Sequence, residues 1–244
     1  MSASPFHDFY KSDLQSVYAL CVVPLVFLAW LLLSRRARAS ARSDKAWRRF
    51  LYAYSVAFAL ETILDPIATG PLTQWLGAGD SPLGTAILLT FVLLGDFRVY
   101  LLIFFMAHLA RPERTPGRAL AESAAWTFVV PVFAYAVDTA LHHARADLPG
   151  ETIWLVYELS FLGVAMWLCG KGIPRRFHRR DRVLRRRIQA VAGYAAVYYA
   201  LWATADVLIM VFALDAGWAL RVIPNQLYYS LYLPFVYFQL TSRR

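Results

Sequence analysis

The chain has 244 residues, of which 59% are hydrophobic and 17% charged, and its formal net charge is +9. A soluble domain carries about a quarter charged residues, so this composition favours a single membrane domain that occupies residues 1–244. The charges cluster in short runs between long uncharged stretches. This distribution argues against nucleic-acid binding, because loop arginines beside a membrane act as topology signals and lie close to anionic lipid.

Seven stretches are long and apolar enough to cross a bilayer as helices. They cover approximately residues 13–33, 50–69, 84–109, 119–141, 152–170, 187–213 and 218–241. Residues 70–83 are rich in Gly and Pro and are predicted to form a loop, with Trp75 at the membrane interface. Membrane helices tolerate proline, so Pro24, Pro131 and Pro234 are predicted to bend rather than break their helices. The predicted fold is therefore all-α, a polytopic seven-transmembrane-helix bundle.

Lysine and arginine lie mainly on one side of the predicted membrane. The connections at 35–49, 111–118 and 171–187 hold seven, three and nine of them, and the tail adds Arg243 and Arg244. The opposite side has two, Lys11 and Arg145. The positive-inside rule then predicts an external N-terminus and a cytoplasmic C-terminus in the cell membrane, which is the inner membrane if the source is bacterial.

Apart from acids near the ends of the spans, such as Glu122 and Asp138, five acidic residues lie inside the predicted membrane spans, namely Glu61, Asp65, Asp96, Glu158 and Asp206. A carboxylate in a bilayer costs a few kcal/mol or more, so such residues usually serve a function. With the predicted orientation, all five lie at the middle or in the outer half of the membrane. Pro66 disfavours helical geometry at Asp65, so the second helix is predicted to bend or end there. The set predicts a polar pocket that faces outward.

Aromatic and amide side chains are predicted at the same membrane level. Tyr199, Trp202 and Asp206 share one face of the sixth helix. The seventh helix contributes Asn225, Gln226, Tyr229 and Tyr232. Aromatic faces bind ammonium groups, and Asp206 or Glu61 would supply the counter-charge. The predicted occupant is a small cationic or zwitterionic ligand, or a lipid headgroup, and the protein would be a receptor, channel or carrier.

A single arginine, Arg98, lies near the centre of the third predicted helix. It is two positions from Asp96, so the two side chains point to nearly opposite sides, and Arg98 is expected to meet an acid from another helix. Arg221, near the outer end of the seventh helix, is expected to offset part of the remaining negative charge. The surplus must be protonated, solvated or matched by a bound cation. The competing interpretation is that individual acids make structural hydrogen bonds or ion pairs.

Several other chemistries do not fit the sequence. A retinal Schiff base needs a lysine in the last helix, whereas Lys11, Lys45 and Lys171 all lie outside the predicted helices. Every histidine falls at a helix end or in a loop, so neither a haem site nor a zinc site is predicted. Nucleophile motifs and Gly-rich phosphate loops are also missing from the sequence, so no cofactor is expected. Cys21 and Cys169 are expected at opposite membrane faces, too far apart for a disulfide.

An enzymatic alternative comes from two short segments, LLGDF at 93–97 and ATADVL at 203–208, together with NQLYYSLY at 225–232. They resemble motifs of the lysoplasmalogenase family, membrane enzymes with paired aspartates. The resemblance implies an intramembrane lipid hydrolase with Asp96 and Asp206 as general acid and base. The spacing between the motifs differs from that of the family, and the chain has one predicted helix fewer. Proton or cation conduction is a third possibility, but the inner half of the membrane has no acids to continue it.

Overall fold

The computed structural model describes residues 4–79, 81–110, 115–145, 148–150, 152–177 and 181–242, and all regular secondary structure in these ranges is helical. The predicted all-α class is therefore confirmed. Some residues used in the sequence predictions lie outside these ranges: His178 and the loop and tail arginines Arg111, Arg114, Arg179, Arg180, Arg243 and Arg244.

Among the described residues, six helical segments are long and apolar enough to cross a membrane. They are Leu14–Leu33, Ala46–Trp75, Pro82–Leu109, Pro116–Ala144, Thr152–Arg176 and Arg182–Met210. These segments match the first six predicted helices and indicate a multi-pass membrane protein. The seventh predicted helix is also helical, as α11 (Ala216–Asn225), the π-helical η5 (Gln226–Leu231) and α12 (Tyr232–Thr241). It falls outside the six apolar segments, and its polar residues include Arg221, Asn225 and Gln226.

The first membrane span consists of η1 (Leu14–Tyr18) and α2 (Ala19–Leu33). Two short helices that were not predicted flank it, α1 (Pro5–Lys11) and α3 (Arg35–Ala41). Both begin at a serine whose hydroxyl accepts a backbone N–H, Ser4 for α1 and Ser34 for α3. Side-chain capping of this kind stabilises polar helices that a search for apolar stretches does not find.

The second span continues further than predicted, through α4 (Ala46–Ile67), η2 (Ala68–Leu72) and α5 (Thr73–Trp75). The prediction of a loop from residue 70 is therefore wrong for residues 70–75, and α4 does not end at Asp65. Threonine hydroxyls satisfy carbonyl groups along this irregular stretch. Thr69 donates to the Asp65 carbonyl at 2.8 Å, and Thr73 donates to the Thr69 carbonyl at 2.9 Å.

The remaining spans are helices with limits close to the predicted ones: α6 (Pro82–Leu109), α7 (Pro116–Ala144), α8 (Thr152–Trp167) with η3 (Leu168–Gly172) and α9 (Ile173–Arg176), and α10 (Arg182–Met210). The prediction for the sixth helix was displaced, because α10 begins in the arginine-rich run at 182 and ends at 210 rather than 213. Pro24 and Pro131 lie inside α2 and α7, which continue through them as expected.

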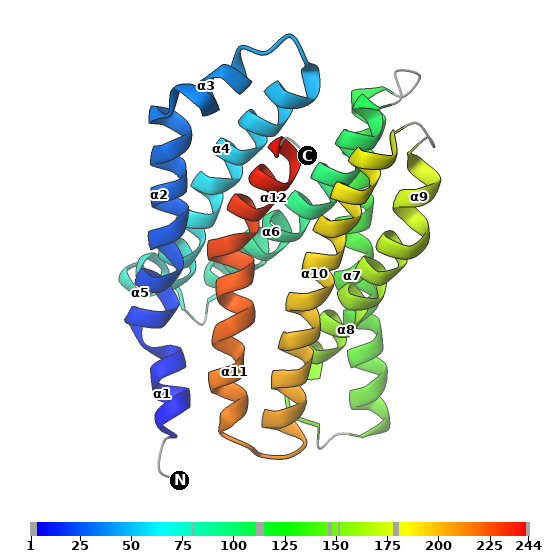
Figure 1. The fold of residues 1–244 in the computed structure, drawn as a ribbon. Helices are drawn as coiled ribbons and strands as arrows, with labels where there is room; N and C mark the ends of the chain where they lie inside the picture. The colour runs from blue at the N-terminus through cyan, green and yellow to red at the C-terminus, as the bar shows by residue number, and fades with distance from the viewer. Residues whose placement is uncertain are drawn as a thin grey trace.

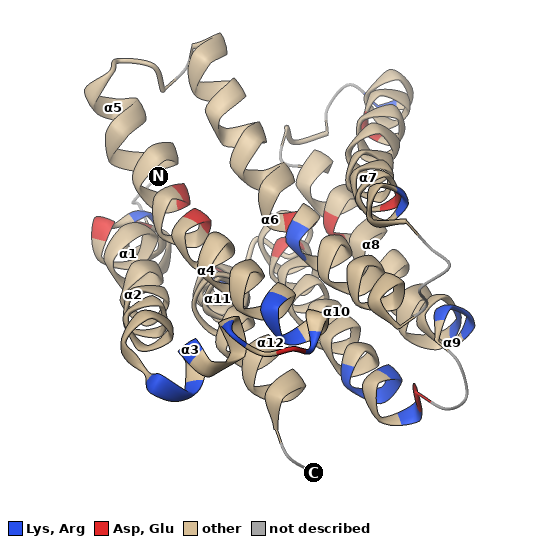
Figure 2. Ribbon diagram, turned by 90° about the horizontal axis from the view of Figure 1, so that it is seen from above, with Lys and Arg blue, Asp and Glu red and all other residues tan. Residues whose placement is uncertain are grey.

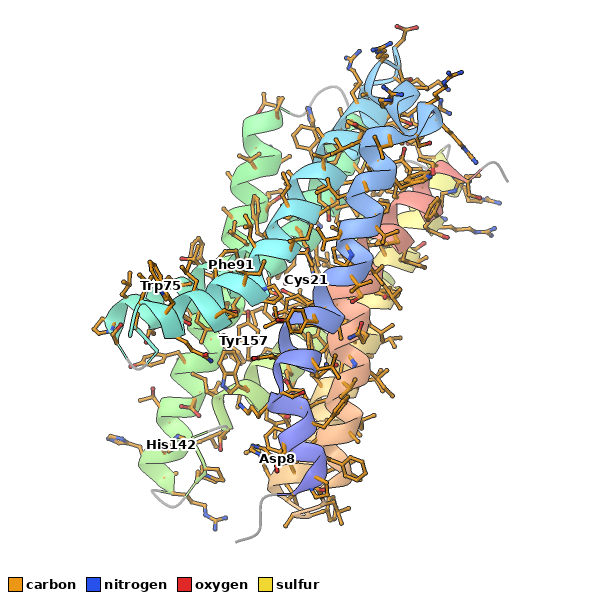
Figure 3. The ribbon with its side chains drawn as sticks, turned by 90° about the vertical axis from the view of Figure 1, so that its left-hand side faces the viewer. Asp8, Cys21, Trp75, Phe91, His142 and Tyr157 are labelled. Atoms are coloured by element: carbon orange, nitrogen blue, oxygen red, sulfur yellow. The ribbon has the colours of Figure 1, made fainter. Side chains whose placement is uncertain are left out.

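The helices pack as a bundle in which α10 lies against α8 and α11, α6 against α7 and α4, and α2 against α4 and η5 (Figure 1). The second half of α6 lies in the interior, where most residues from Gly95 to His108 are buried. Its first half extends to the side of the bundle together with the end of the second span, as the positions of Phe91 and Trp75 show (Figure 3). Lysine and arginine gather around α3, α9 and the start of α10 (Figure 2), which lie at the same end of the molecule in Figure 1.

Candidate functional site

Arg98 of α6 forms the centre of the first polar group. The residue is 1% exposed, and its guanidinium donates to the Thr62 hydroxyl at 2.8 Å and to the Tyr228 carbonyl at 2.7 Å. Its Nη1 atom lies 3.6 Å from Oε2 of Glu61 in α4. The expectation that Arg98 meets an acid from another helix is therefore confirmed. Burial makes this contact important, because an unpaired guanidinium at this depth would be strongly destabilising.

Two tyrosine rings of the last helical segment lie on the same guanidinium. The Arg98 carbon Cζ is 4.2 Å from the ring centre of Tyr228 and 4.9 Å from that of Tyr232. Tyr232 was predicted to offer its ring to a ligand, but in the structure that ring is fully buried against Arg98. The cation–π partner is thus a group of the protein itself. Tyr228, which was not predicted, lies on Arg98 because the π-helical turn of η5 changes which residues share a face.

Asp65 lies one turn beyond Glu61 on α4 and is 4% exposed. Its carboxylate accepts a hydrogen bond from the Thr69 hydroxyl at 3.4 Å and interacts with the Tyr229 side chain. The hydrogen-bond partners of Asp65 are therefore neutral hydroxyl groups, whereas Glu61 forms an ion pair with Arg98. Tyr229, one of the predicted ligand residues, thus contacts a predicted acid.

Asp96 is the centre of the second polar group and is 2% exposed. The Tyr157 hydroxyl donates to its Oδ2 and the Tyr199 hydroxyl to its Oδ1, both as short hydrogen bonds. Asp96 thus faces α8 and α10, whereas Arg98 faces α4 and η5, which confirms that the two side chains point apart. Tyr157 was not among the predicted site residues, although Tyr157 directly precedes the predicted acid Glu158. Tyr157 is labelled near the middle of the view in Figure 3.

A small cavity adjoins Asp96. Its volume of about 10 Å³ provides room for about one water molecule. Asp96 shares its wall with three aromatic rings, those of Tyr100, Phe161 and Tyr199, and with aliphatic side chains. The ring centres of Phe161 and Tyr199 are 4.9 Å apart and those of Tyr100 and Phe161 are 6.0 Å apart. The surface of the cavity is almost entirely apolar, and Asp96 lies in its wall beside the three aromatic rings.

Arg221 of α11 forms the centre of the third polar group. It donates to both carboxylate oxygens of Asp206, from Nε at 2.6 Å and from Nη2 at 2.7 Å. Glu158 of α8 is further away, with its Oε1 atom 3.9 Å from the same Nη2. The expectation that Arg221 offsets part of the acidic charge is confirmed, and one guanidinium serves two neighbouring carboxyl groups. Such a bidentate pair fixes α11 against α10.

The remaining predicted ligand groups have partners within the protein. The Trp202 indole N–H donates to Oδ1 of Asn225 at 2.8 Å, and the Asn225 amide donates to the Tyr10 hydroxyl at 3.3 Å. The Gln226 side chain accepts a hydrogen bond from the Ser230 hydroxyl at 2.7 Å. Asn225 therefore connects α11 to α10 and α1, whereas the hydrogen bond of Gln226 lies within η5.

The five acids consequently form three separate groups. Glu61 and Asp65 lie near Arg98, Asp96 is held by two tyrosines, and Asp206 and Glu158 lie at Arg221. Asp96 accepts from Tyr199, which lies seven residues before Asp206 on α10, or about 10 Å along the helix axis. Asp206 is held instead by Arg221. Among the described residues, no three His, Cys, Asp or Glu side chains are placed to share a metal ion. The outward-facing pocket predicted from the sequence, large enough for a complete small ligand or lipid headgroup, therefore stays a prediction.

Comparison with known proteins gives no family for the chain: no family model matches it, and neither the curated proteins nor the solved structures searched contain a significant match. The resemblance of residues 93–97 and 203–208 to lysoplasmalogenases therefore rests on these short segments alone. The function has to be argued from the three polar groups and the cavity.

Proposed function

We propose that the protein binds the ammonium group of a small cationic or zwitterionic ligand, a lipid headgroup included, at Asp96 within the membrane. It would act as a receptor, channel or carrier in the cell membrane. In this proposal seven helices cross the membrane, the N-terminus is external and the C-terminus is cytoplasmic. The site would be reached from the outer side.

The cavity beside Asp96 is the observation that carries the proposal. A desolvated ammonium group is stabilised by aromatic faces within about 6 Å and by a carboxylate counter-charge. Tyr100, Phe161 and Tyr199 supply the faces, and Asp96 supplies the charge. The two hydroxyls that hold Asp96 in place are neutral donors, so they orient the carboxylate without cancelling its charge.

The balance of buried charge supports a cation at this position. Arg98 is paired with Glu61, and Arg221 is paired with Asp206. Among the described residues, the buried carboxyl groups of Asp65 and Asp96 form no ion pair with a guanidinium, and Glu158, at 3.9 Å, shares Arg221 with Asp206. Burial of an ionised carboxylate without a matching charge is costly, so a bound cation would stabilise the occupied state.

The size of the cavity limits the ligand. A volume of about 10 Å³ admits a group of the size of water or ammonium. A larger headgroup requires α8 to move away from α10, which would displace Tyr157 or Phe161. We therefore expect the protein to prefer ammonium and primary amines over quaternary amines unless this movement occurs.

The length of the last helical segment and the charge distribution support the proposed topology. The 10, 6 and 10 residues of α11, η5 and α12 span about 39 Å as a continuous helix, which exceeds the hydrocarbon thickness. Its arginine and its amide side chains have partners within the bundle, so they need not meet lipid. The basic end of the molecule would face the cytoplasm (Figure 2).

Thermal unfolding of the full chain in lipid nanodiscs tests the proposal. Methylammonium and choline would be titrated against sodium at equal ionic strength. A ligand that binds the folded state stabilises it by about 2.7 kcal/mol at a concentration of 100 times its Kd. Saturable stabilisation by methylammonium in the wild type, lost in Asp96→Asn, is the expected result.

Asp138→Asn is the matched control, because Asp138 lies near the end of α7 beside His142, at 3.3 Å, outside the three polar groups. This variant should keep the full response. An unchanged response in Asp96→Asn, or no saturable response to either amine, would refute the proposal. Lipid turnover that is lost in both Asp96→Asn and Asp206→Asn would instead support the hydrolase.

A further inference from the structure

A second, larger cavity lies on the outside of the bundle, in a groove between α7 and α8. Its volume is about 380 Å³, and its walls are almost entirely apolar. The walls of the groove include Trp126, Val129 and Phe133 of α7 and Gly163, Val164 and Trp167 of α8. Val129 and Phe133 are 52% and 55% exposed, so the groove is open to the surroundings of the protein.

The two helices that form the groove belong to the six apolar segments, and they are the least buried of them. Only 17% of the most apolar stretch of Pro116–Ala144 is buried within the protein, and 22% of that of Thr152–Arg176. Their exposed faces therefore meet the hydrocarbon of a bilayer. The one hydroxyl in the groove wall, that of Ser160, donates to the Val156 carbonyl at 2.6 Å, so its own proton is satisfied within α8.

One end of the groove is aromatic and is followed by basic residues. Trp126 and Trp167 stack there with ring centres 5.2 Å apart. Lys171 lies one helical turn beyond Trp167, and Arg175 one turn further, both on the exposed surface. Tryptophan followed by lysine and arginine is typical of the boundary between hydrocarbon and headgroups. The charge at this end suits the phosphate of an anionic lipid.

We infer that the groove is a binding site for one acyl chain of an anionic phospholipid from the leaflet at the Lys171 end. The chain lies between Val129 and Phe133 on one side and Val164 on the other, and the phosphate lies near Lys171. Residue 163, in the wall of the groove, is glycine. A β-carbon at Gly163 would meet no other atom within 4 Å, so the missing side chain leaves empty space at this point.

A photoreactive acyl chain tests this inference. The full chain would be reconstituted in phosphatidylcholine vesicles with a small fraction of phosphatidylglycerol that carries a diazirine in one acyl chain. The expected result is labelling of residues 152–176 that unlabelled phosphatidylglycerol competes away and that excess phosphatidylcholine does not. Gly163→Leu, which fills the groove, should lower this labelling about tenfold, equivalent to about 1.4 kcal/mol of binding free energy.

Gly193→Leu is the matched control. Gly193 is also a helical glycine in a membrane span, and a β-carbon there would likewise meet nothing within 4 Å. This variant should label like the wild type. If Gly163→Leu does not fold, Val129→Trp fills the groove from the opposite wall and should have the same effect. Lys171→Glu should reduce the preference for phosphatidylglycerol over phosphatidylcholine while the groove itself stays intact.

Three outcomes would overturn the inference. Equal labelling of the wild type and the groove-filling variants would mean that the groove holds no chain. Labelling that excess phosphatidylcholine competes as well as phosphatidylglycerol does would indicate ordinary contact with bulk lipid. Crosslinks from a photoreactive residue at Val129 to a second copy of the chain would show that a protein partner covers the groove.

Discussion

The hydroxyl of Tyr228 in η5 lies directly against Gly95 in α6, so close that a β-carbon at position 95 would overlap the hydroxyl oxygen. Gly95 thus allows the Tyr228 ring to approach α6 and to lie 4.2 Å from the Arg98 guanidinium. The Tyr228 carbonyl accepts a hydrogen bond from the same guanidinium at 2.7 Å. A residue without a side chain therefore helps to position the partner of the buried arginine.

Replacement of Gly95 by alanine should destabilise the protein. The new methyl group has to displace the Tyr228 hydroxyl, and insertion of extra atoms into a packed core costs about 1–3 kcal/mol. Thermal or denaturant unfolding in detergent micelles measures this change. Gly193→Ala is the matched control and should be neutral or slightly stabilising, because its β-carbon meets nothing and alanine favours helix. Equal stability of the two variants would contradict the packing described here.

Arg98→Lys should be strongly destabilising even though it conserves the charge. Lysine lacks the planar fork that reaches Thr62 and the Tyr228 carbonyl together. Breaking a buried charged contact costs about 3–5 kcal/mol. The free energy of unfolding measures the loss, and Arg118→Lys, at an exposed position in the first turn of α7, should show no change. A loss below about 1 kcal/mol at Arg98 would mean that its contacts contribute little, as in an exposed ion pair.

The two acids that contact Arg221 should respond differently to neutralisation. Asp206→Asn removes a bidentate ion pair and should destabilise the junction of α10 and α11. Glu158→Gln removes a carboxylate 3.9 Å from the same guanidinium and next to Asp206, so relief of the like-charge repulsion should offset the lost contact.

A double-mutant cycle with Arg221→Gln measures the difference. The coupling of Arg221 with Asp206 should lie at the upper end of the usual range of about 0.5–3 kcal/mol, and the coupling with Glu158 near its lower end. The reverse order would show that Glu158 is the principal partner of Arg221.

Cysteine labelling tests the proposed topology. In a variant without Cys21 and Cys169, cysteines at Gly150, between α7 and α8, and at Asp44, between α3 and α4, would be exposed to a maleimide that does not cross membranes. Gly150→Cys should react in intact cells, and Asp44→Cys should react only after permeabilisation, because the arginine-rich connection lies inside. Reaction of Asp44→Cys in intact cells would show that the protein has the opposite orientation to the one proposed. If both cysteines reacted in intact cells, residues 44 and 150 would lie on the same side of the membrane. That result would contradict either a membrane-spanning α7 or the odd number of membrane-spanning helices proposed between these positions.

The placement of the acids was predictable in outline because each charged residue interrupts an apolar stretch. Arg98 and Asp96 are two positions apart on a helix, which is enough to predict that they face different neighbours. The role of Tyr157 was not predictable in this way, since a tyrosine in an apolar helix looks the same whether it faces lipid or a carboxylate. Tyr228 was missed because α-helical spacing was assumed for residues 226–231, where the structure has a π-helix.

The all-helical class, the approximate limits of six long apolar helices and the presence of costly buried charges follow from the sequence, because hydropathy and helix length are properties of contiguous residues. The specific pairings, Arg98 with Glu61, Arg221 with Asp206, and Asp96 with two tyrosines, are visible only in the folded molecule. These pairings depend on the rotation of each helix about its axis and on which helices are neighbours. Side chains from all the packed helices set both together, so no single stretch of sequence specifies them.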